Sequence, residues 1–518
     1  MNKKSIEESL NCRIKNAKAM MKSYDDYALM LTKNICEPFY ALSSSDGKKD
    51  NNNQHVTHNS INRNPTDNPI QSYPSIIHFN NAGSSPQPLP ILEEVIQHTI
   101  LESLVGGYQA AEMCLNQKLD VYRSIATFIN AIHGREEIAL VESATVAWTR
   151  IFYSICDTVM TGNHKDAENI ILCCEAEYAA NVVAMQKICN EKKASLLAIP
   201  GKNGIVDVSI LNDILNGMYS YRDFDCQGGD QDSPDMNPEK KYLDPQNIRL
   251  ICITHIPTNS GVINPVNEIG QQIEQFNQKH KDRTHPIYYL VDACQSIGQL
   301  SIDVQEIKCD ALSATGRKYL RGPRGTGFLY VKKNTAEQMI PSHIDHASAP
   351  IKYIPDKNKD NVRFEYKAGA SRFEFWEANV ANQLGLGRAV AYAMQKNIGW
   401  IENQCRMLGS AMKHKLKALN KELQNDKIYI HHDNDHIPHA QCGIISFYVR
   451  GCNASQIKEN LLDCGITTSI VPPTSTPFDS ARSGLGDREL LRISLSYFNT
   501  NEEIDLCCDK LATIIREI

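Results

Sequence analysis

Residues 291–330 read VDACQSIGQLSIDVQEIKCDALSATGRKYLRGPRGTGFLY, and this stretch contains the pattern that decides the fold. An apolar run over residues 287–291 predicts a short buried strand, which delivers Asp292 to its carboxyl end. A second apolar run, at residues 311–313, leads within a few residues to Lys318, and glycines and a third apolar run follow. An acid, a lysine and glycines at strand ends are typical of a site at the carboxyl edge of an open α/β sheet.

Lys318 and Asp292 form a pair whose chemistry points to one cofactor. A lysine in a short loop between buried strands is partly desolvated, and burial disfavours the ammonium form and makes the amine a usable nucleophile. Such a lysine can form a Schiff base with an aldehyde, while an acid at a neighbouring strand end suits a protonated ring nitrogen. These are the two groups that pyridoxal phosphate requires. The sequence therefore predicts a pyridoxal phosphate enzyme with Lys318 as its catalytic residue.

The same stretch resembles the core of the class V aminotransferases, a branch of the fold-type I pyridoxal phosphate enzymes that includes cysteine desulfurases and selenocysteine lyases. Asp292-Ala-Cys-Gln295 matches the family pattern D-x-x-Q, and Thr315-Gly-Arg-Lys318 matches (S/T)-x-(H/R)-K. The resemblance implies an α/β fold of the fold-type I kind, in which a large domain with a mostly parallel sheet is joined to a smaller C-terminal α+β domain. It also implies a homodimer with shared active sites that acts on a small amino-acid substrate.

The resemblance further assigns residues to the cofactor. Asp292 is expected at the pyridine nitrogen, Gln295 at the phenolic oxygen and Tyr178 stacked on the ring. The phosphate is expected at the N-terminus of a helix near residue 144, where backbone N–H groups form an anion site, although Ser143 or Thr145 would also serve as a simple helix cap. The complete set of predicted cofactor-binding residues is Asp292, Gln295, Thr315, Arg317, Thr145, Ala144, Tyr178, Asn181, Thr258 and Asn259.

The predicted substrate contacts lie near the two ends of the globular part. Arg492 belongs to a family signature that continues through Ser494, Tyr497, Asn499 and Thr500, and its planar fork suits an amino-acid carboxylate. By resemblance, Asn81, Ala82 and Gly83 line the substrate side of the cofactor. Thr258 aligns without a gap with a family asparagine and Asn259 stands one residue late, so the sequence leaves open which of them reaches the cofactor.

Three departures from the family indicate the reaction. Tyr178 replaces a family histidine, and a tyrosine with an ordinary pKa near 10 cannot exchange protons as readily at neutral pH. Residues 470–490 contain no cysteine where desulfurases carry one, and Cys464 lies on a predicted helix instead. Phe375 and Trp376 replace a small pair after Arg372-Phe-Glu, a segment that by resemblance reaches a dimer partner's cofactor, and Trp376 is a weak site candidate.

The departures favour a C–S lyase that performs β-elimination on a cysteine conjugate or a cysteine sulfoxide. In this the chain resembles hercynylcysteine sulfoxide lyase-type members of the family, which belong to ergothioneine biosynthesis, and isopenicillin epimerase. An aminotransferase or an epimerase is the alternative, and a non-catalytic binding module is a distant one. The distant alternative predicts a broken cofactor site, whereas the lysine, acid, glutamine and arginine are all present.

Three regions are predicted along the chain. Residues 1–75 form an N-terminal helical extension and an Asn-rich linker that has too little apolar surface to order itself. Residues 76–375 form the large cofactor-binding domain, with polar insertions at about 222–247 and 342–362. Residues 376–518 form interdomain helices and the small C-terminal domain.

Composition limits the partners and the compartment. A chain of 518 residues is too long for one compact core, and its formal net charge of −6 gives no sign of a nucleic-acid partner. No apolar run is long enough to predict a membrane span. The 17 cysteines are scattered, several of them in apolar runs, which is typical of reduced thiols. Because the first residues also lack an apolar signal-peptide core, a cytoplasmic location is expected.

A histidine-rich segment, HHDNDHIPHAQC, contains His431, His432, His436 and His439. It lacks a helical H-x-x-x-H spacing and includes a proline, so the sequence favours a solvated loop over a structural zinc site. No metal site is predicted.

Overall fold

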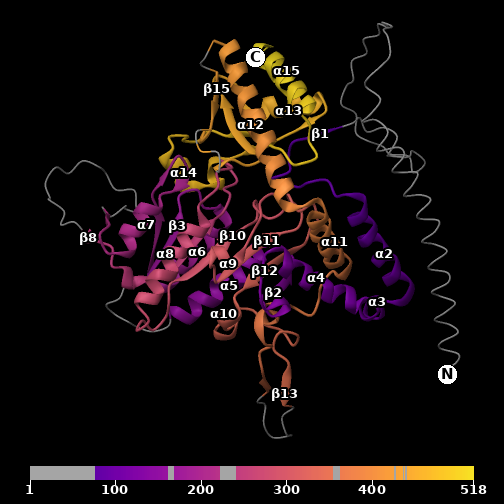
Figure 1. Ribbon diagram of the computed structural model, residues 1–518, viewed down its shortest axis with the longest axis vertical. Helices are drawn as coiled ribbons and strands as arrows, with labels where there is room; N and C mark the ends of the chain where they lie inside the picture. The colour runs from indigo at the N-terminus through magenta and orange to yellow at the C-terminus, as the bar shows by residue number, and fades with distance from the viewer. Residues whose placement is uncertain are drawn as a thin grey trace.

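A computed structural model describes residues 76–160, 169–221, 241–353, 362–424, 427–435, 437 and 440–517 (Figure 1). The predicted N-terminal extension and linker, most of the first insertion, and the residues His436 and His439 lie outside the described residues.

A seven-stranded sheet forms the centre of the large domain. The strand order is β2-β12-β11-β10-β9-β3-β4, and only β12 runs antiparallel to the others. The strands are β2 (Ile138–Val141), β3 (Asn169–Cys174), β4 (Ala194–Ile199), β9 (Ile248–Thr254), β10 (Tyr288–Asp292), β11 (Ala311–Thr315) and β12 (Gly327–Val331). The three strands predicted in and around the opening stretch are β10, β11 and β12, so the prediction of an α/β fold with a mostly parallel sheet is confirmed.

Helices cover both faces of this sheet, which explains why its central strands read as continuous apolar runs (Figure 1). Successive side chains of a strand point to opposite faces, so Leu290 packs in the core beneath α5 (Ala144–Val159) and α6 (Ala179–Lys192). Val291 packs in the core on the other face with α8 (Val266–Lys279). The core on that second side also includes residues of α2 (Leu89–Val105) and α4 (Leu115–Phe128), which are connected by α3 (Gly107–Met113).

The small domain is built on a second, antiparallel sheet with the order β15-β16-β19-β18. Its strands are β15 (Ile428–Ile430), β16 (Ile444–Val449), β18 (Ser469–Val471) and β19 (Leu490–Ser494). The helices α12 (Ile398–Glu422), α13 (Ala454–Asp463) and α15 (Asn501–Glu517) pack on it, and α11 (Val380–Lys396) precedes them. The predicted α+β character of this domain is confirmed.

Two features of the small domain differ from the sequence predictions. The chain from residue 76 was assigned to the large domain, but β1 (Ile77–His78) pairs in parallel with β17 (Ile466–Thr467), and Phe79 is fully buried in the small-domain core. Such a pairing joins distant segments and has no local signal. The cysteine-free segment was read as a loop but contains α14 (Pro477–Arg482), where a proline in the first turn favours a helix start.

The two insertions emerge from the large domain as short antiparallel pairs. The described ends of the second insertion form β13 (Ile351–Tyr353) and β14 (Arg363–Phe364), which project away from the body of the molecule (Figure 1). Those of the first form β7 (Ser220–Tyr221) and β8 (Lys241–Tyr242). In the part of the chain that the structure describes, no helix is both long and apolar enough to cross a membrane.

Candidate active site

A pocket opens at the carboxyl ends of the central strands. It is lined by Ala144, Thr145, Tyr178, Asn181, Thr254, Ile256, Thr258, Asp292, Cys294, Gln295 and Lys318. Most of the predicted cofactor-binding residues, which come from separate segments of the chain, therefore lie around one space. Cys294, Thr254 and Ile256 also line this space, although the sequence motifs do not predict them as site residues.

Lys318 follows β11 and is 9% exposed, so the prediction of a desolvated lysine is confirmed. Burial lowers the pKa of the Lys318 amine. The positive charges of Arg317 and Arg492 lower it further, while Cys294 and Asp292 oppose that effect. These surroundings favour the neutral amine, which is the form that acts as a nucleophile or a base.

Asp292 ends β10 and is held by two N–H donors. Its Oδ2 accepts from the Asn181 amide at 3.0 Å, and its Oδ1 accepts from the backbone N–H of Cys294 at 2.8 Å. Burial raises the pKa of the Asp292 carboxyl, and these hydrogen bonds together with Lys318 oppose the rise. The donors fix the orientation of the carboxylate and favour its ionised form.

Behind Asp292 lies a second buried carboxyl group, Glu177. The Asn181 amide donates to Glu177 Oε1 at 2.8 Å as well as to Asp292, and Thr254 donates through its backbone N–H and its hydroxyl at 3.0 and 2.6 Å. Burial raises the pKa of Glu177 to about 7. Glu177 was not predicted as a site residue, and the structure shows that its carboxyl group holds the Asn181 amide in place.

One wall of the pocket is the N-terminus of α5. Ser143 caps this helix, and its hydroxyl oxygen accepts from the Val146 N–H at 3.2 Å. Ala144 and Thr145, which line the pocket, are the first two helical residues, so the capping and anion-binding interpretations are compatible.

Thr315 and Arg317, also predicted at the phosphate, are engaged elsewhere. The Thr315 hydroxyl donates to the Thr326 carbonyl at 3.3 Å inside the sheet, and the Arg317 guanidinium donates to the Gly83 carbonyl. Neither is among the lining residues, since each side chain is occupied by a backbone acceptor.

Tyr178 immediately precedes α6 at the edge of the pocket. Its side chain is 39% exposed, which leaves a ring face available for stacking. Burial of the hydroxyl end raises the pKa of Tyr178, so the phenol stays neutral at neutral pH.

Arg492 approaches the pocket from the small domain. Its Nε donates to the Ser469 hydroxyl at 3.1 Å, and its Nη1 donates to the Thr258 hydroxyl at 2.6 Å and to the Thr258 carbonyl at 3.3 Å. Burial lowers the pKa of the guanidinium to about 10. Arg492 is not itself a lining residue, but it bonds to Thr258, which is one, and among the described residues no carboxylate forms an ion pair with it.

Thr258 and Asn259, between which the sequence left the cofactor contact open, lie in different positions. Thr258 lines the pocket and accepts from Arg492. Asn259 is fully buried and donates from its side chain to the Pro472 carbonyl at 3.3 Å, away from the lining residues.

The three residues predicted on the substrate side have different surroundings. The Ala82 carbonyl accepts from the Gln295 amide at 3.2 Å, and the Gly83 carbonyl accepts from Arg317. The Asn81 amide donates to the Ser494 carbonyl at 2.8 Å, and its oxygen accepts from the Ser85 hydroxyl at 2.8 Å. The side chain of Asn81 therefore joins the start of the described chain to β19.

The segment compared with a dimer contact is anchored within its own chain. Arg372 donates to the carbonyls of Lys367 and Met339 at 3.0 and 3.1 Å. Trp376 is 56% exposed and lies beside His346, outside the pocket.

The residues of the pocket fit pyridoxal phosphate. They supply a buried amine for the aldehyde, an oriented carboxylate for the ring nitrogen and a helix N-terminus for the phosphate. The Gln295 amide oxygen is buried and makes no hydrogen bond to the described residues, which leaves one polar atom for a ligand.

The expectation of a solvated histidine loop is wrong for its first two residues. His431 is buried, and both His431 and His432 contact Asp479, a residue of α14. The turn brings them against a helix that the sequence did not reveal.

Comparisons with known proteins agree with this geometry. The aminotransferase class-V family model matches residues 226–507. A cysteine desulfurase from Wigglesworthia glossinidia brevipalpis is 25% identical over 437 residues, which cover 83% of this chain and 90% of that protein. A probable cysteine desulfurase from Synechocystis sp. is 26% identical over 456 residues, covering 86% of this chain and 92% of that protein.

Two solved structures show the same fold. The apo structure of a cysteine desulfurase from Thermococcus onnurineus NA1 has a TM-score of 0.68 at 19% identity, over 86% of this chain and 95% of that chain. The cystine C–S lyase C-DES in complex with cysteine persulfide has a TM-score of 0.62 at 18% identity, over 84% and 97%. The family predicted from the two motifs is confirmed: the chain belongs to the aminotransferase class-V family and is a pyridoxal phosphate-dependent enzyme of fold type I.

Proposed function

We propose that this enzyme is a C–S lyase that removes a sulfur substituent by β-elimination from a cysteine conjugate or a cysteine sulfoxide. The observation that carries the proposal is the buried pair of Lys318 and Asp292 in a pocket whose lining residue Thr258 accepts a hydrogen bond from Arg492, a buried cation that has no carboxylate partner among the described residues. An amino acid offers the two complements, an α-proton for the amine and a carboxylate for the guanidinium.

Each residue has a defined task in this proposal. Pyridoxal phosphate, when bound, supplies an electron sink for the carbanion at the substrate Cα. The Lys318 Nζ takes the α-proton, and the burial that lowers its pKa favours the unprotonated amine that this step needs. Asp292, oriented by Asn181, holds a proton at the ring nitrogen. Arg492 grips the substrate carboxylate and thereby aligns the Cα–H bond.

The sulfur then leaves with the bonding electron pair of the Cβ–S bond. The proton from Cα stays on Lys318 until a product receives it. Elimination leaves the substrate as an unsaturated amino acid, and its hydrolysis by water gives pyruvate and ammonia. The segment at residues 470–490 supports release of the sulfur in the product, because it folds in part into α14 and contains no thiol that could carry sulfur away.

A desulfurase is the second candidate, and the names of the curated relatives favour it. That reaction needs a thiol that accepts the sulfur. Cys294 lines the pocket. Burial raises the pKa of its thiol, and the nearby Lys318 opposes that rise. In this case cysteine would yield alanine, with the sulfur held on Cys294.

Product analysis separates the candidates. We expect the holoenzyme to convert an S-alkylcysteine or its sulfoxide into equal amounts of pyruvate and ammonia, with Lys318→Ala as the inactive control. Alanine with a protein persulfide that disappears in Cys294→Ser would replace the lyase by a desulfurase. Transfer of the amino group to an added oxo acid without loss of sulfur would indicate an aminotransferase, and inversion at Cα alone would indicate an epimerase.

We further propose a cytoplasmic homodimer. Exposed apolar side chains on and beside α3 and α4, including Tyr108, Leu115 and Ile132, support a partner surface. The free and mostly buried cysteines of the described residues support a reducing compartment. Light scattering of the full chain tests the dimer, and cell fractionation tests the location.

A further inference from the structure

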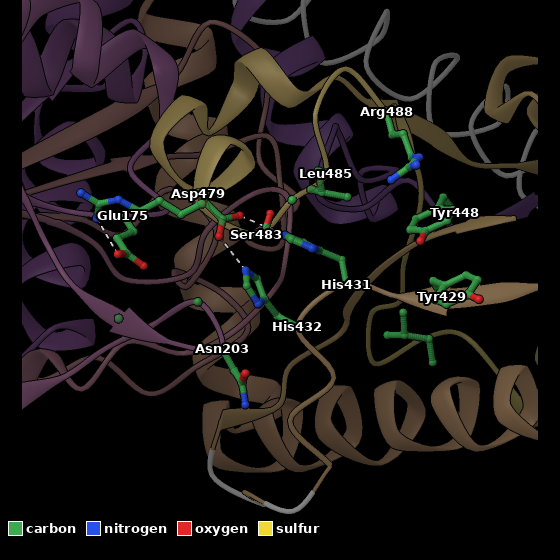
Figure 2. Close-up of a pocket in the computed structure, with 15 residues that line it drawn as sticks. Glu175, Asn203, Tyr429, His431, His432, Tyr448, Asp479, Ser483, Leu485 and Arg488 are labelled. Carbon is green, nitrogen blue, oxygen red and sulfur yellow. Dashed lines mark hydrogen bonds and ion pairs between the residues drawn. The ribbon is translucent and has the colours of Figure 1, made fainter. Parts of the chain in front are cut away.

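A second pocket, with a volume of about 500 Å³, lies between the two domains (Figure 2). One wall is the hairpin of β5 (Gly201–Lys202) and β6 (Ile205–Val206) from the large domain. The opposite wall consists of the turn after β15 and the helix α14, both of the small domain. The pocket is distinct from the cofactor pocket, and the proposed reaction uses none of its side chains.

Two imidazoles and a carboxylate converge in this pocket. His431 Nε2 lies 2.9 Å from Asp479 Oδ2, and His432 Nε2 lies 2.6 Å from Asp479 Oδ1. One potential ligand atom from each residue lies within 4.8 Å of the others. Figure 2 shows both rings directed at the carboxylate. The side chains of His431 and Asp479 are only 5% and 3% exposed, and that of His432 is 13% exposed. Three polar side chains are therefore close together and largely shielded from solvent.

The side chains that converge here carry donor atoms of the kinds that metals bind in proteins, namely imidazole nitrogens and carboxylate oxygens.

The surroundings fix the two rings in place. The backbone N–H of His431 donates to the Ser446 carbonyl at 2.9 Å, which ties the turn to β16. Gly204 packs against His432 so closely that an added Cβ would lie 2.6 Å from the ring. The Asn434 amide donates to the Asn203 carbonyl at 3.0 Å and joins the same turn to the hairpin. Supporting contacts of this kind orient ligands in metal centres.

We propose that His431, His432 and Asp479 form a binding site for a divalent transition metal of the zinc class, with its remaining coordination positions open to the pocket. Two nitrogen ligands and one oxygen ligand suit zinc and its neighbours, whereas magnesium and calcium prefer oxygen ligands alone. Three protein ligands leave at least one position for water or a small ligand.

Such an ion would fasten α14 to the turn after β15. Asp479 and His431 are 48 residues apart along the chain, and the ion would link them directly. Arg482, at the other end of α14, pairs with Glu175 of the large domain, three residues before Tyr178. The metal would therefore hold α14 in place, and α14 contacts Glu175, which follows β3 and precedes Tyr178 at the cofactor pocket.

Zinc titration of the holoenzyme tests the site. Protein without a histidine tag is treated with a chelator, dialysed, and titrated with Zn²⁺ against a coloured competitor. We expect one equivalent to bind to the wild type, and the affinity to fall by at least about 100-fold in His432→Gln and in Asp479→Asn, the upper end of what supporting residues alone contribute. His343→Gln, which removes an exposed histidine elsewhere, should bind zinc like the wild type.

Cobalt substitution excludes the many thiols as the ligands. Co²⁺ at a site of imidazoles and a carboxylate gives visible bands without the strong thiolate charge-transfer absorption of a cysteine site. Circular dichroism and bound-cofactor absorbance must match the wild type in each variant, and Asp479→Glu, which keeps a carboxylate, should retain part of the affinity. Failure of the wild type to bind stoichiometric zinc, or unchanged binding in His432→Gln and Asp479→Asn, would overturn the proposal.

Discussion

The pocket around Lys318 (the cofactor pocket) and the pocket around His431, His432 and Asp479 (the histidine pocket) both contain buried polar groups. The charges in the two pockets are unbalanced in opposite directions. In the cofactor pocket the one oriented anion, Asp292, is held by N–H donors, and the buried cation of Arg492 next to the pocket has no carboxylate partner among the described residues. In the histidine pocket the ionised Asp479 faces two imidazoles. Burying an uncompensated charge is costly, so the sign of the surplus indicates the sign of the missing ligand. The first pocket suits the carboxylate of an amino acid and a phosphate group, and the second pocket suits a cation.

Replacing Lys318 should give the largest effect. We expect Lys318→Ala to lose more than about 10³-fold in turnover, because the base for the α-proton is removed. Zinc binding at the histidine pocket should stay unchanged, which would show that the two pockets are independent. Lys308→Ala, which removes a partly exposed lysine paired with Glu274, is the matched control. Turnover of Lys318→Ala close to that of the wild type would contradict the assignment of Lys318 as the catalytic base.

Arg492 tests the charge surplus itself. We expect Arg492→Ala to lose about 2–5 kcal/mol of transition-state stabilisation in kcat/KM, since the substrate carboxylate would lose its buried partner. Cofactor content should remain unchanged. Arg492→Lys keeps the charge but loses the planar fork and should recover only part of the loss. The exposed Arg363→Ala serves as control, and an Arg492→Ala variant with normal kcat/KM would show that the surplus is not used for substrate.

The two pockets should also respond to pH with opposite sign. Burial raises the pKa of Glu177 from 4.5 to about 7, so the folded protein binds more protons than the unfolded chain between these values. The resulting stabilisation, about 3 kcal/mol at most, is complete below pH 4.5 and is lost as the pH rises to 7. For His431 the pKa is lowered from 6.5, so its contribution is lost as the pH falls below that value.

Thermal unfolding across this pH range measures both trends. In Glu177→Gln the decline of Tm between pH 4.5 and 7 should be weaker than in the wild type, whatever the overall stability of the variant. In His431→Gln the loss of Tm on acidification should be weaker instead. Parallel Tm profiles for the wild type and both variants would contradict the opposite signs.

The smallest effect is expected from Arg482, which brings a positive charge into the histidine pocket. Its ion pair with Glu175 is partly exposed, so Arg482→Gln should cost less than about 1 kcal/mol of stability. Zinc should bind roughly two- to five-fold more tightly, because a cation near the site is gone. Arg516→Gln, at a surface ion pair with Glu422, is the control. Weaker zinc binding in Arg482→Gln would contradict the charge argument.

The same contrast explains how far the sequence predicted the molecule. Asp292 and Lys318 lie within one stretch, and the parallel pairing of β10 with β11 sets Asp292 opposite Ser313, just before the turn that contains Lys318. Neighbouring apolar runs were enough to predict that juxtaposition. Asn181 and Arg492 were predicted only because the chain resembles a known family.

The histidine pocket had no comparable signal. Asp479 meets His431 and His432 only after α14 forms and docks, and α14 is too short to show a helical period. The role of Asn81 was missed for a similar reason, since its partner is the carbonyl of Ser494 on a distant strand. A proline after Ser475-Thr476 was the one local hint of a helix start.

The pairing of β1 with β17 has a consequence for the order of synthesis. Asn81 leaves the ribosome 413 residues before its partner Ser494, so the first strand must wait until nearly the whole chain has been translated. During that time its backbone edge is open to chaperones and proteases. A deletion that removes only the last strands would therefore also leave β1 and Asn81 without their partners. We expect chaperones and proteases to recognise such a truncated chain as incompletely folded.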